Sequence, residues 1–182
     1  GAARLYAGDF DGASEAWKAS TKLDPNPASY SNTGAALFYA NRFPEAIRNY
    51  RAALALNPDD HRLWGNLAEA LLLDGTDPEE TRKAYDSAIS LAEAVKAINP
   101  DDAPTLSRLA VYYAAIDRAD IAVRHMSRAQ ELAGLDIDVL YDSAVALTLM
   151  DQLTAAKEVI TKALDAGYPG TLMQADPLLR YQ

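Results

Sequence analysis

The chain has 182 residues, of which 49% are hydrophobic and 24% charged, a balance typical of a folded globular protein rather than a disordered one. Its net charge of −9 disfavours nucleic acid and anionic membrane surfaces as partners, because both are themselves negatively charged. No apolar run approaches the ~20 residues that a membrane helix needs, and the absence of cysteine excludes disulfides, thiolate metal sites and cysteine nucleophiles.

The first complete unit in chain order is a predicted pair of helices in residues 27–60. Tyr30, Gly34 and Leu37 recur at helical spacing, and the missing side chain at Gly34 allows a second helix to cross closely. Pro44 opens that second helix at a position where its missing N–H costs nothing. Residues 1–26 match only the later part of this pattern. We therefore predict a truncated unit there and expect the natural protein to continue N-terminally.

The next unit, residues 61–102, is longer than the one before it. Its closing proline, Pro100, follows Pro58 by 42 residues rather than 34. One of the additional residues falls in the turn between the helices, and the others lengthen the second helix. We expect this helix to run from about Pro78 to Ile98, roughly 30 Å at 1.5 Å per residue, and to overhang its neighbours.

Two further helix pairs follow in residues 103–136 and 137–170, in register with the earlier ones. Equivalent positions are separated by 34 residues, as in Tyr30 and Trp64, Gly34 and Ala68, Ala110 and Ala144, Ala122 and Ala156, and Ala129 and Ala163. The last segment, residues 171–182, has Leu172, Leu178 and Leu179 as its apolar set. Because the end of a helix stack exposes an apolar face, we expect this segment to be a cap.

A period of 34 residues with an aromatic residue, a small residue, then Ala-x3-aromatic and a closing proline resembles the tetratricopeptide repeat family along most of the chain. The resemblance implies an all-α fold, an α-α superhelix or solenoid of about five helix-turn-helix repeats with a C-terminal capping segment. We expect a single array over 1–182, divided at 1–26, 27–60, 61–102, 103–136, 137–170 and 171–182. The ending AGYP…DPLLR also resembles bacterial modules of this family joined to larger proteins.

No arrangement of residues typical of an active site is found in the sequence. His61 is expected in a loop and His125 on an exposed helical stretch, as separate surface residues. There is no glycine-rich phosphate loop, nucleophile elbow or His-x3-His motif. The acidic run from Asp74 to Glu80 lacks the ligand spacing and central glycine of a calcium loop, so helix capping is the favoured interpretation. We predict a protein that is not an enzyme and has no cofactor and no metal.

In the family that the chain resembles, the first helices of the repeats line a concave groove. The repeat frame gives the candidate ligand-groove residues Asn32, Tyr39, Arg62, Asn66, Glu69, Arg108 and Tyr141. We expect Tyr39, Asn66, Glu69, Arg108 and Tyr141 to be exposed to the groove. For Leu72, Leu73, Val111 and Leu149, exposure to the groove and packing between repeats both remain open.

Some members of the family bind the C-terminal carboxylate of a chaperone through a Lys/Asn/Asn/Lys/Arg set. The matching places here hold Ser31, Ala35, Glu69, Pro104 and Arg108. Only Arg108 fits this set, and Glu69 would repel a carboxylate. We therefore reject a chaperone-tail ligand.

The resemblance and the small, apolar groove positions favour a protein-protein interaction scaffold that binds a peptide or a partner helix. One alternative is self-association, as a homo-oligomer, through the helix at Pro78–Ile98 or the open N-terminal face. Another is a regulatory or substrate-docking arm of a bacterial kinase, cyclase, glycosyltransferase or transcription regulator. Neither nucleic acid binding nor membrane insertion is expected. The composition fits a soluble protein of the cytoplasm or the periplasm, with the cytoplasm preferred.

Overall fold

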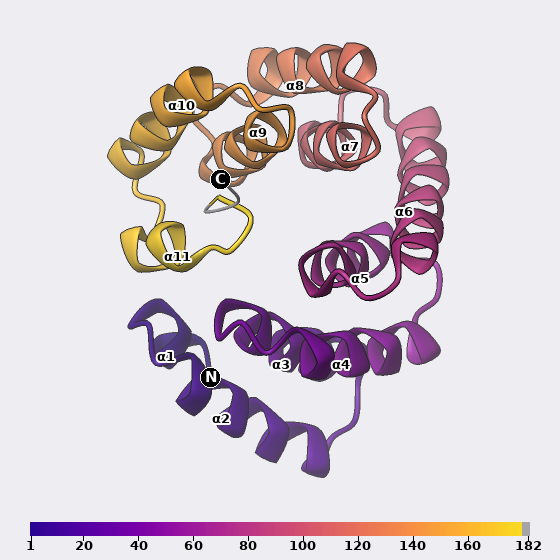
Figure 1. The fold of residues 1–182 in the computed structure, drawn as a ribbon, viewed down its shortest axis with the longest axis vertical. Helices are drawn as coiled ribbons and strands as arrows, with labels where there is room; N and C mark the ends of the chain where they lie inside the picture. Colours follow the sequence, from indigo (N-terminus) through magenta and orange to yellow (C-terminus); the bar gives the residue numbers. More distant parts are fainter. Residues whose placement is uncertain (180–182) are drawn as a thin grey trace.

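The computed structural model describes residues 1–179, and over this range the chain is all-helical, with eleven helices and no strand (Figure 1). The helices are α1 (Ala2–Tyr6), α2 (Phe10–Leu23), α3 (Pro27–Tyr39), α4 (Phe43–Leu56), α5 (His61–Asp74), α6 (Pro78–Ile98), α7 (Ala103–Ala115), α8 (Ala119–Ala133), α9 (Ile137–Leu149), α10 (Leu153–Asp165) and α11 (Gly170–Ala175). The expected solenoid class is confirmed, and α6 has the predicted bounds.

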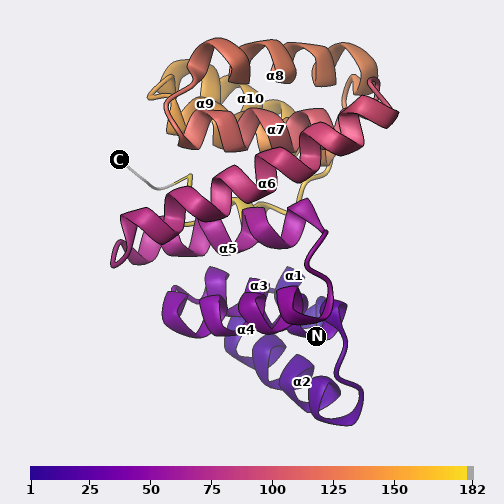
Figure 2. The ribbon, with the colours of Figure 1, turned by 90° about the vertical axis from the view of Figure 1, so that its right-hand side faces the viewer.

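From α1 to α10, each helix packs on the next one along the chain, and the array curves around a centre (Figure 1). Figure 1 shows α5, α7 and α9 nearer to this centre than α6, α8 and α10. We call α3, α5, α7 and α9 the inner helices, and α2, α4, α6, α8 and α10 the outer helices. Figure 2 shows that α6 is the longest helix. Near its end, Val95 and Ile98 are 38% and 88% exposed.

The turns that lead into each outer helix share one backbone conformation. One residue in each turn has a positive φ, between 57° and 81°: Gly8, Asn41, Gly75, Asp117 and Asp151. Glycine adopts this left-handed conformation without strain, and asparagine and aspartate tolerate it because their short polar side chains bond locally. The repeat thus includes a turn position that the aromatic and alanine pattern does not show.

The inner helices begin at a capping side chain. Asn26 caps α3, Asp60 caps α5, Asp102 caps α7 and Asp136 caps α9, each accepting a backbone N–H of the first helical turn. Such caps satisfy donors that a helix start leaves unpaired. Asp77 caps α6 in the same way, accepting from the N–H of Glu80 at 2.8 Å, which is the capping role expected from the sequence.

Close helix crossings depend on small side chains. A Cβ at Gly34 would lie 2.7 Å from Cε1 of Tyr50, so only glycine admits the ring there, as predicted. Gly65 makes the same room for Tyr112, whose ring is fully buried. One core cluster extends through α3 to α9 around these rings.

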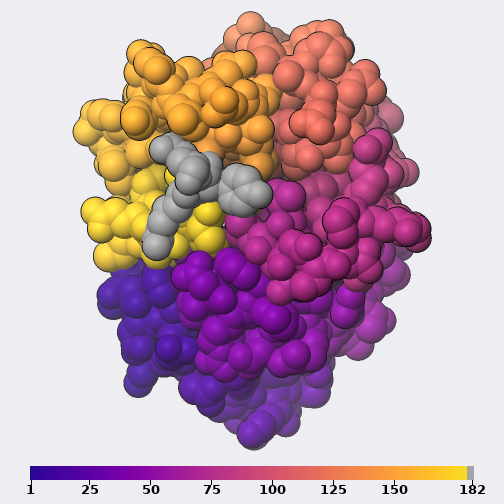
Figure 3. Space-filling model, in the orientation of Figure 1, coloured from indigo at the N-terminus to yellow at the C-terminus, as the bar shows by residue number. Residues whose placement is uncertain are grey.

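The end of the chain does more than cover the last helix pair. Leu172 and Leu178 are buried, as expected of a cap, while residues 180–182 of the expected segment lie outside the described residues. The hydroxyl of Thr171 donates to the main-chain oxygen of Tyr6 at 2.7 Å, which joins α11 to α1. The described helices therefore form a closed ring, and Figure 3 shows the region of α11, in yellow, between the first and last helix pairs. The N-terminal face is covered in part by α11, so it is less open than predicted.

Candidate peptide-binding surface

The seven candidate residues all lie on inner helices. Asn32 and Tyr39 are on α3, Arg62, Asn66 and Glu69 on α5, Arg108 on α7 and Tyr141 on α9. The structure does not bring them together in one open groove. Instead, they fall into a buried ionic network, a polar hollow and a set of contacts with the C-terminal segment.

The buried network is centred on Arg108. Its guanidinium donates to Glu69 Oε1 at 2.6 Å and to Asp142 Oδ1 at 3.2 Å. Asp142 also accepts from the hydroxyl of Ser107 at 2.6 Å. Glu69 is only 7% exposed and the side chain of Arg108 16%, so the predicted groove exposure is wrong for both. The ion pairs explain the difference, because paired charges can be buried where single ones cannot.

Two carboxylates share this single guanidinium. Burial raises the pKa of Glu69 and of Asp142 above their ordinary values, and Arg108 opposes the rise in both. Burial alone would lower the pKa of Arg108, but Glu69 and the other groups around the guanidinium raise it overall. Arg108 therefore stays charged, and its charge limits the rise in the pKa of both acids. Asp142 was not among the predicted residues, although it follows Arg108 by one 34-residue period.

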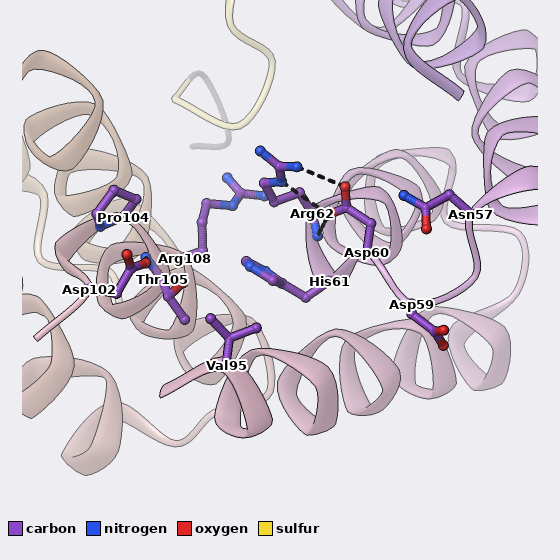
Figure 4. A pocket seen from close by; sticks show the side chains of 10 residues that line it. All are labelled: Asn57, Asp59, Asp60, His61, Arg62, Val95, Asp102, Pro104, Thr105 and Arg108. Carbon is purple, nitrogen blue, oxygen red and sulfur yellow. Dashed lines mark hydrogen bonds and ion pairs between the residues drawn. The ribbon is translucent and has the colours of Figure 1, made fainter. Parts of the chain in front are cut away.

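A polar hollow lies at the start of α3 and α5. It has a volume of about 540 Å3, and Asn32, Arg62 and Asn66 line it. A second hollow of about 440 Å3 lies between α5 and α7, and Figure 4 shows Arg62 and Arg108 among its lining residues. The two hollows share Asn57, Asp60 and Arg62 in their walls, so we treat them as one surface, the polar hollow.

Asn32 and Asn66 occupy equivalent positions in this hollow. They are 34 residues apart, on neighbouring inner helices; Asn32 is exposed and Asn66 is half-buried. Within residues 1–179, neither side-chain amide makes a hydrogen bond. The guanidinium of Arg62 is held by Asp60 at 2.8 Å but remains mostly exposed. The hollow thus presents two available amides beside an exposed cation.

Tyr39 and Tyr141 are half-buried by the protein itself instead of lying open to the groove. Tyr141 stacks on Tyr168 with ring centroids 4.9 Å apart, and its hydroxyl donates to Asp176 Oδ2 at 2.5 Å. Tyr39 stacks on Phe10 at 5.5 Å. Burial raises the pKa of Tyr39 and of Tyr141 well above the ordinary value. Sequence reasoning missed this because it gave the C-terminal segment no place in the ring.

The leucines left open by the sequence are packed rather than free. Leu72, Leu73 and Leu149 are half-buried against the core cluster, and Val111 is fully buried. The apolar groove suggested by the sequence is therefore largely filled, and the exposed inner surface is polar.

The expectation that His61 is a surface residue of a loop is wrong. His61 is the first residue of α5, is 9% exposed, and lies with Nδ1 3.3 Å from the Tyr112 hydroxyl. Burial lowers the pKa of His61, which favours the neutral ring. His125 is half-buried and stacks on Tyr113 at 5.6 Å. Among residues 1–179, no group of three or more histidine and acidic side chains is arranged to hold a metal ion.

Comparisons with known proteins agree with this geometry. A family model described as tetratricopeptide repeat matches residues 32–103. The solved structure of a thermophilic tetratricopeptide repeat protein of Thermus thermophilus aligns over 98% of this chain and 95% of its own, with a TM-score of 0.65 and 20% identity. MamA of Desulfovibrio magneticus aligns over 90% and 88%, with a TM-score of 0.51 and 21% identity.

A curated relative matches only a short stretch. The peroxisomal targeting signal receptor of Eremothecium gossypii is 46% identical over 56 residues, which are 30% of this chain and 10% of the receptor. The chain thus spans a small part of that protein.

Stacked helix pairs with a repeated turn and a polar inner surface define the class of α-helical solenoids. Residues 32–103 match the tetratricopeptide repeat family, and the described chain has the fold of a solved tetratricopeptide repeat protein. Proteins of this family are generally non-catalytic scaffolds for protein-protein interactions. Separately, no described helix is both long and apolar enough to cross a membrane.

Proposed function

We propose that this chain binds an extended segment of a partner protein in the polar hollow. The observation that carries the proposal is the pair of available amides, Asn32 and Asn66, at equivalent positions of α3 and α5 in one hollow. An asparagine amide offers both an acceptor oxygen and donor hydrogens, which suits the alternating groups of a peptide main chain. The polar lining favours such a segment over the apolar helix suggested by the sequence.

The spacing of the amides is compatible with an extended ligand. Neighbouring packed helices lie about 8–10 Å apart, and an extended chain rises about 3.3 Å per residue. The two amides would therefore bind main-chain groups about three residues apart. Arg62, whose side chain is 69% exposed, can turn from Asp60 to a carboxylate of the same segment. The curated receptor relative gives coarse support to a role in recognition.

The proposal can be tested without knowing the partner. A library of random ten-residue peptides is selected on the native chain, and the Kd of each selected peptide is measured with the double variant Asn32→Ala, Asn66→Ala. A hydrogen bond contributes about 1 kcal/mol, so two lost bonds should weaken binding by about tenfold or more. Asn49→Ala is the matched control, because Asn49 is on the outer helix α4. Equal affinity for the double variant would overturn the proposal.

Self-association is a second candidate, favoured by the exposed end of α6. Ile98 is 88% exposed and Val95 38%, which leaves apolar surface uncovered. Light scattering over a range of concentrations should then show a dimer that Ile98→Ser abolishes, whereas a monomer at every concentration excludes this candidate. The division of the chain into repeats, the cytoplasmic location and the role as an arm of a larger bacterial protein stay predictions.

A further inference from the structure

The centre of the ring is occupied by the chain's own C-terminal segment, Asp176–Leu179. Figure 1 shows this segment leaving α11 and turning inward toward the inner helices. Asp176 is fully buried and Leu178 is 1% exposed, although both follow the last helix. A cap that only covered α10 would not need to enter the centre.

The acidic side chain of the segment is bound at both oxygens. Asp176 Oδ2 accepts from the hydroxyl of Tyr141 at 2.5 Å, and Oδ1 accepts from the main-chain N–H of Leu178 at 2.8 Å. Burial raises the pKa of Asp176, and these two hydrogen bonds oppose the rise. A donor from α9 and one from the segment's own main chain thus hold the carboxylate, in a place that water does not reach.

The apolar side chain of the segment fills a position between the inner helices. Leu178 belongs to the same buried cluster as Leu37 of α3, Leu67 of α5, Val111 of α7 and Val145 of α9. A leucine in such a position buries most of its side chain, which stabilises the bound state by about 25 cal/mol per Å2. The carboxylate and the leucine are two residues apart, so they form a short recognition unit.

The main chain of this segment is attached differently from the rest of the fold. Within the described residues, the backbone groups of Gln174–Leu179 make no hydrogen bond to the other helices. The attachment consists of the Asp176 carboxylate and apolar side chains. It therefore has the character of a bound peptide, in which side chains fill prepared places, rather than of a further repeat.

We propose that the centre of the ring is a peptide-binding site whose resident ligand is the segment Asp176–Leu179, and that a partner segment with a carboxylate two residues before a leucine displaces it. The site goes beyond the polar hollow, because Tyr141 and the apolar residues that hold the segment do not line that hollow. A tethered segment acts at an effective concentration of about millimolar, so the resident ligand keeps the site closed to weak competitors.

The test uses the whole chain and a labelled peptide of residues 174–179, Gln-Ala-Asp-Pro-Leu-Leu. Binding is measured by fluorescence anisotropy to the native chain and to the variants Asp176→Asn and Leu178→Ala, each of which weakens the resident segment but leaves the site intact. The peptide should bind both variants at least tenfold more tightly than it binds the native chain. A control peptide, with asparagine for the aspartate and alanine for the first leucine, should not bind.

Gln174→Ala is the matched control variant, because Gln174 is exposed on α11 just before the segment, and it should behave as the native chain does. Equal weak binding to all chains, with helical circular dichroism unchanged, would overturn the proposal. Loss of the helical signal in both Asp176→Asn and Leu178→Ala would overturn it as well, because the segment would then be part of the core rather than a ligand. The peptides selected on the polar hollow respond to different residues, so the two proposals can fail independently.

Discussion

Arg108 supplies the positive charge that pairs two buried carboxylates on the inner helices. Its guanidinium contacts Glu69 and Asp142, and it lies 5.1 Å from the ring centre of Tyr112. A buried ion pair adds little to stability when compared with apolar residues, but removing one partner leaves an uncompensated charge. At the scale of the residue, removing Arg108 should therefore lower the free energy of unfolding by more than its ion pairs contribute to it.

Replacing Arg108 by methionine should lower the free energy of unfolding by about 3–5 kcal/mol, because Glu69 and Asp142 would stay buried without a counter-charge. Urea unfolding of the native chain and the variant measures the difference. The triple variant Arg108→Met, Glu69→Gln, Asp142→Asn should recover much of the loss. No recovery would show that packing of the arginine, rather than its charge, is what the fold needs.

Stability should depend on pH through Glu69. Burial raises the pKa of this carboxyl in the folded state above its ordinary value of 4.5, so the folded state binds its proton more tightly than the unfolded state does. Its contribution is full below pH 4.5 and is lost as the pH rises through the raised value. In Glu69→Gln, the melting temperature should therefore fall less than in the native chain as the pH is raised from 4.5 to 7. An equal fall in both chains would contradict the assignment.

At the scale of the element, helix crossings are set by glycine and tyrosine pairs. Gly34 admits the ring of Tyr50, and Gly65 admits the ring of Tyr112, which in turn reaches the main chain of His61 with its hydroxyl at 3.1 Å. The second pair joins α5 to α7, so it fixes the neighbouring inner helices that carry Glu69 and Arg108.

Gly65→Ala should destabilise the chain by about 1–3 kcal/mol, because the new Cβ would overlap the ring of Tyr112 and force a shift in a packed interior. Thermal unfolding followed by circular dichroism measures this. Gly170→Ala is the matched control, since its Cβ would meet only Leu164 at 3.8 Å. If both variants have the same melting temperature, the close approach at Gly65 does not affect stability and this prediction is wrong.

The sequence predicts the elements well because they depend on local patterns. Helical spacing, the proline at the start of α6 and the extra length before Pro100 were enough to give the bounds of α6. The site was predicted less well, because it depends on contacts between distant residues. Nothing local indicates that Glu69 meets Arg108, that Tyr112 reaches His61, or that Asp176 returns to Tyr141.

At the scale of the whole molecule, closure of the ring gives the first and last described helices a neighbour on both sides. In an open solenoid each end repeat has one neighbour and opens first. Here α1 contacts α11 through Thr171 and Tyr6, and Leu172 is buried near the same junction. The first and last described helices therefore support each other.

Leu172→Ala should loosen this junction. Amide hydrogen exchange in α1 and α2 should then become about tenfold faster, corresponding to about 1.4 kcal/mol of lost local stability, while exchange in α7 stays as it was. Lys162→Ala, an exposed change on α10, is the control. A uniform increase along the chain, or none, would show that the ring is not held at this junction.

The 2.7 Å contact between Thr171 and Tyr6 also bears on how the order of helices along the chain relates to the shape. Because the two ends of the described array are neighbours in space, the same ring can be drawn starting at any of its turns. A circularly permuted gene, with the breaks moved to the left-handed turn at Gly75, would encode the same set of neighbours in a different order. For the segment Asp176–Leu179 at the centre, the permuted chain would change only how many residues precede it and how many follow it.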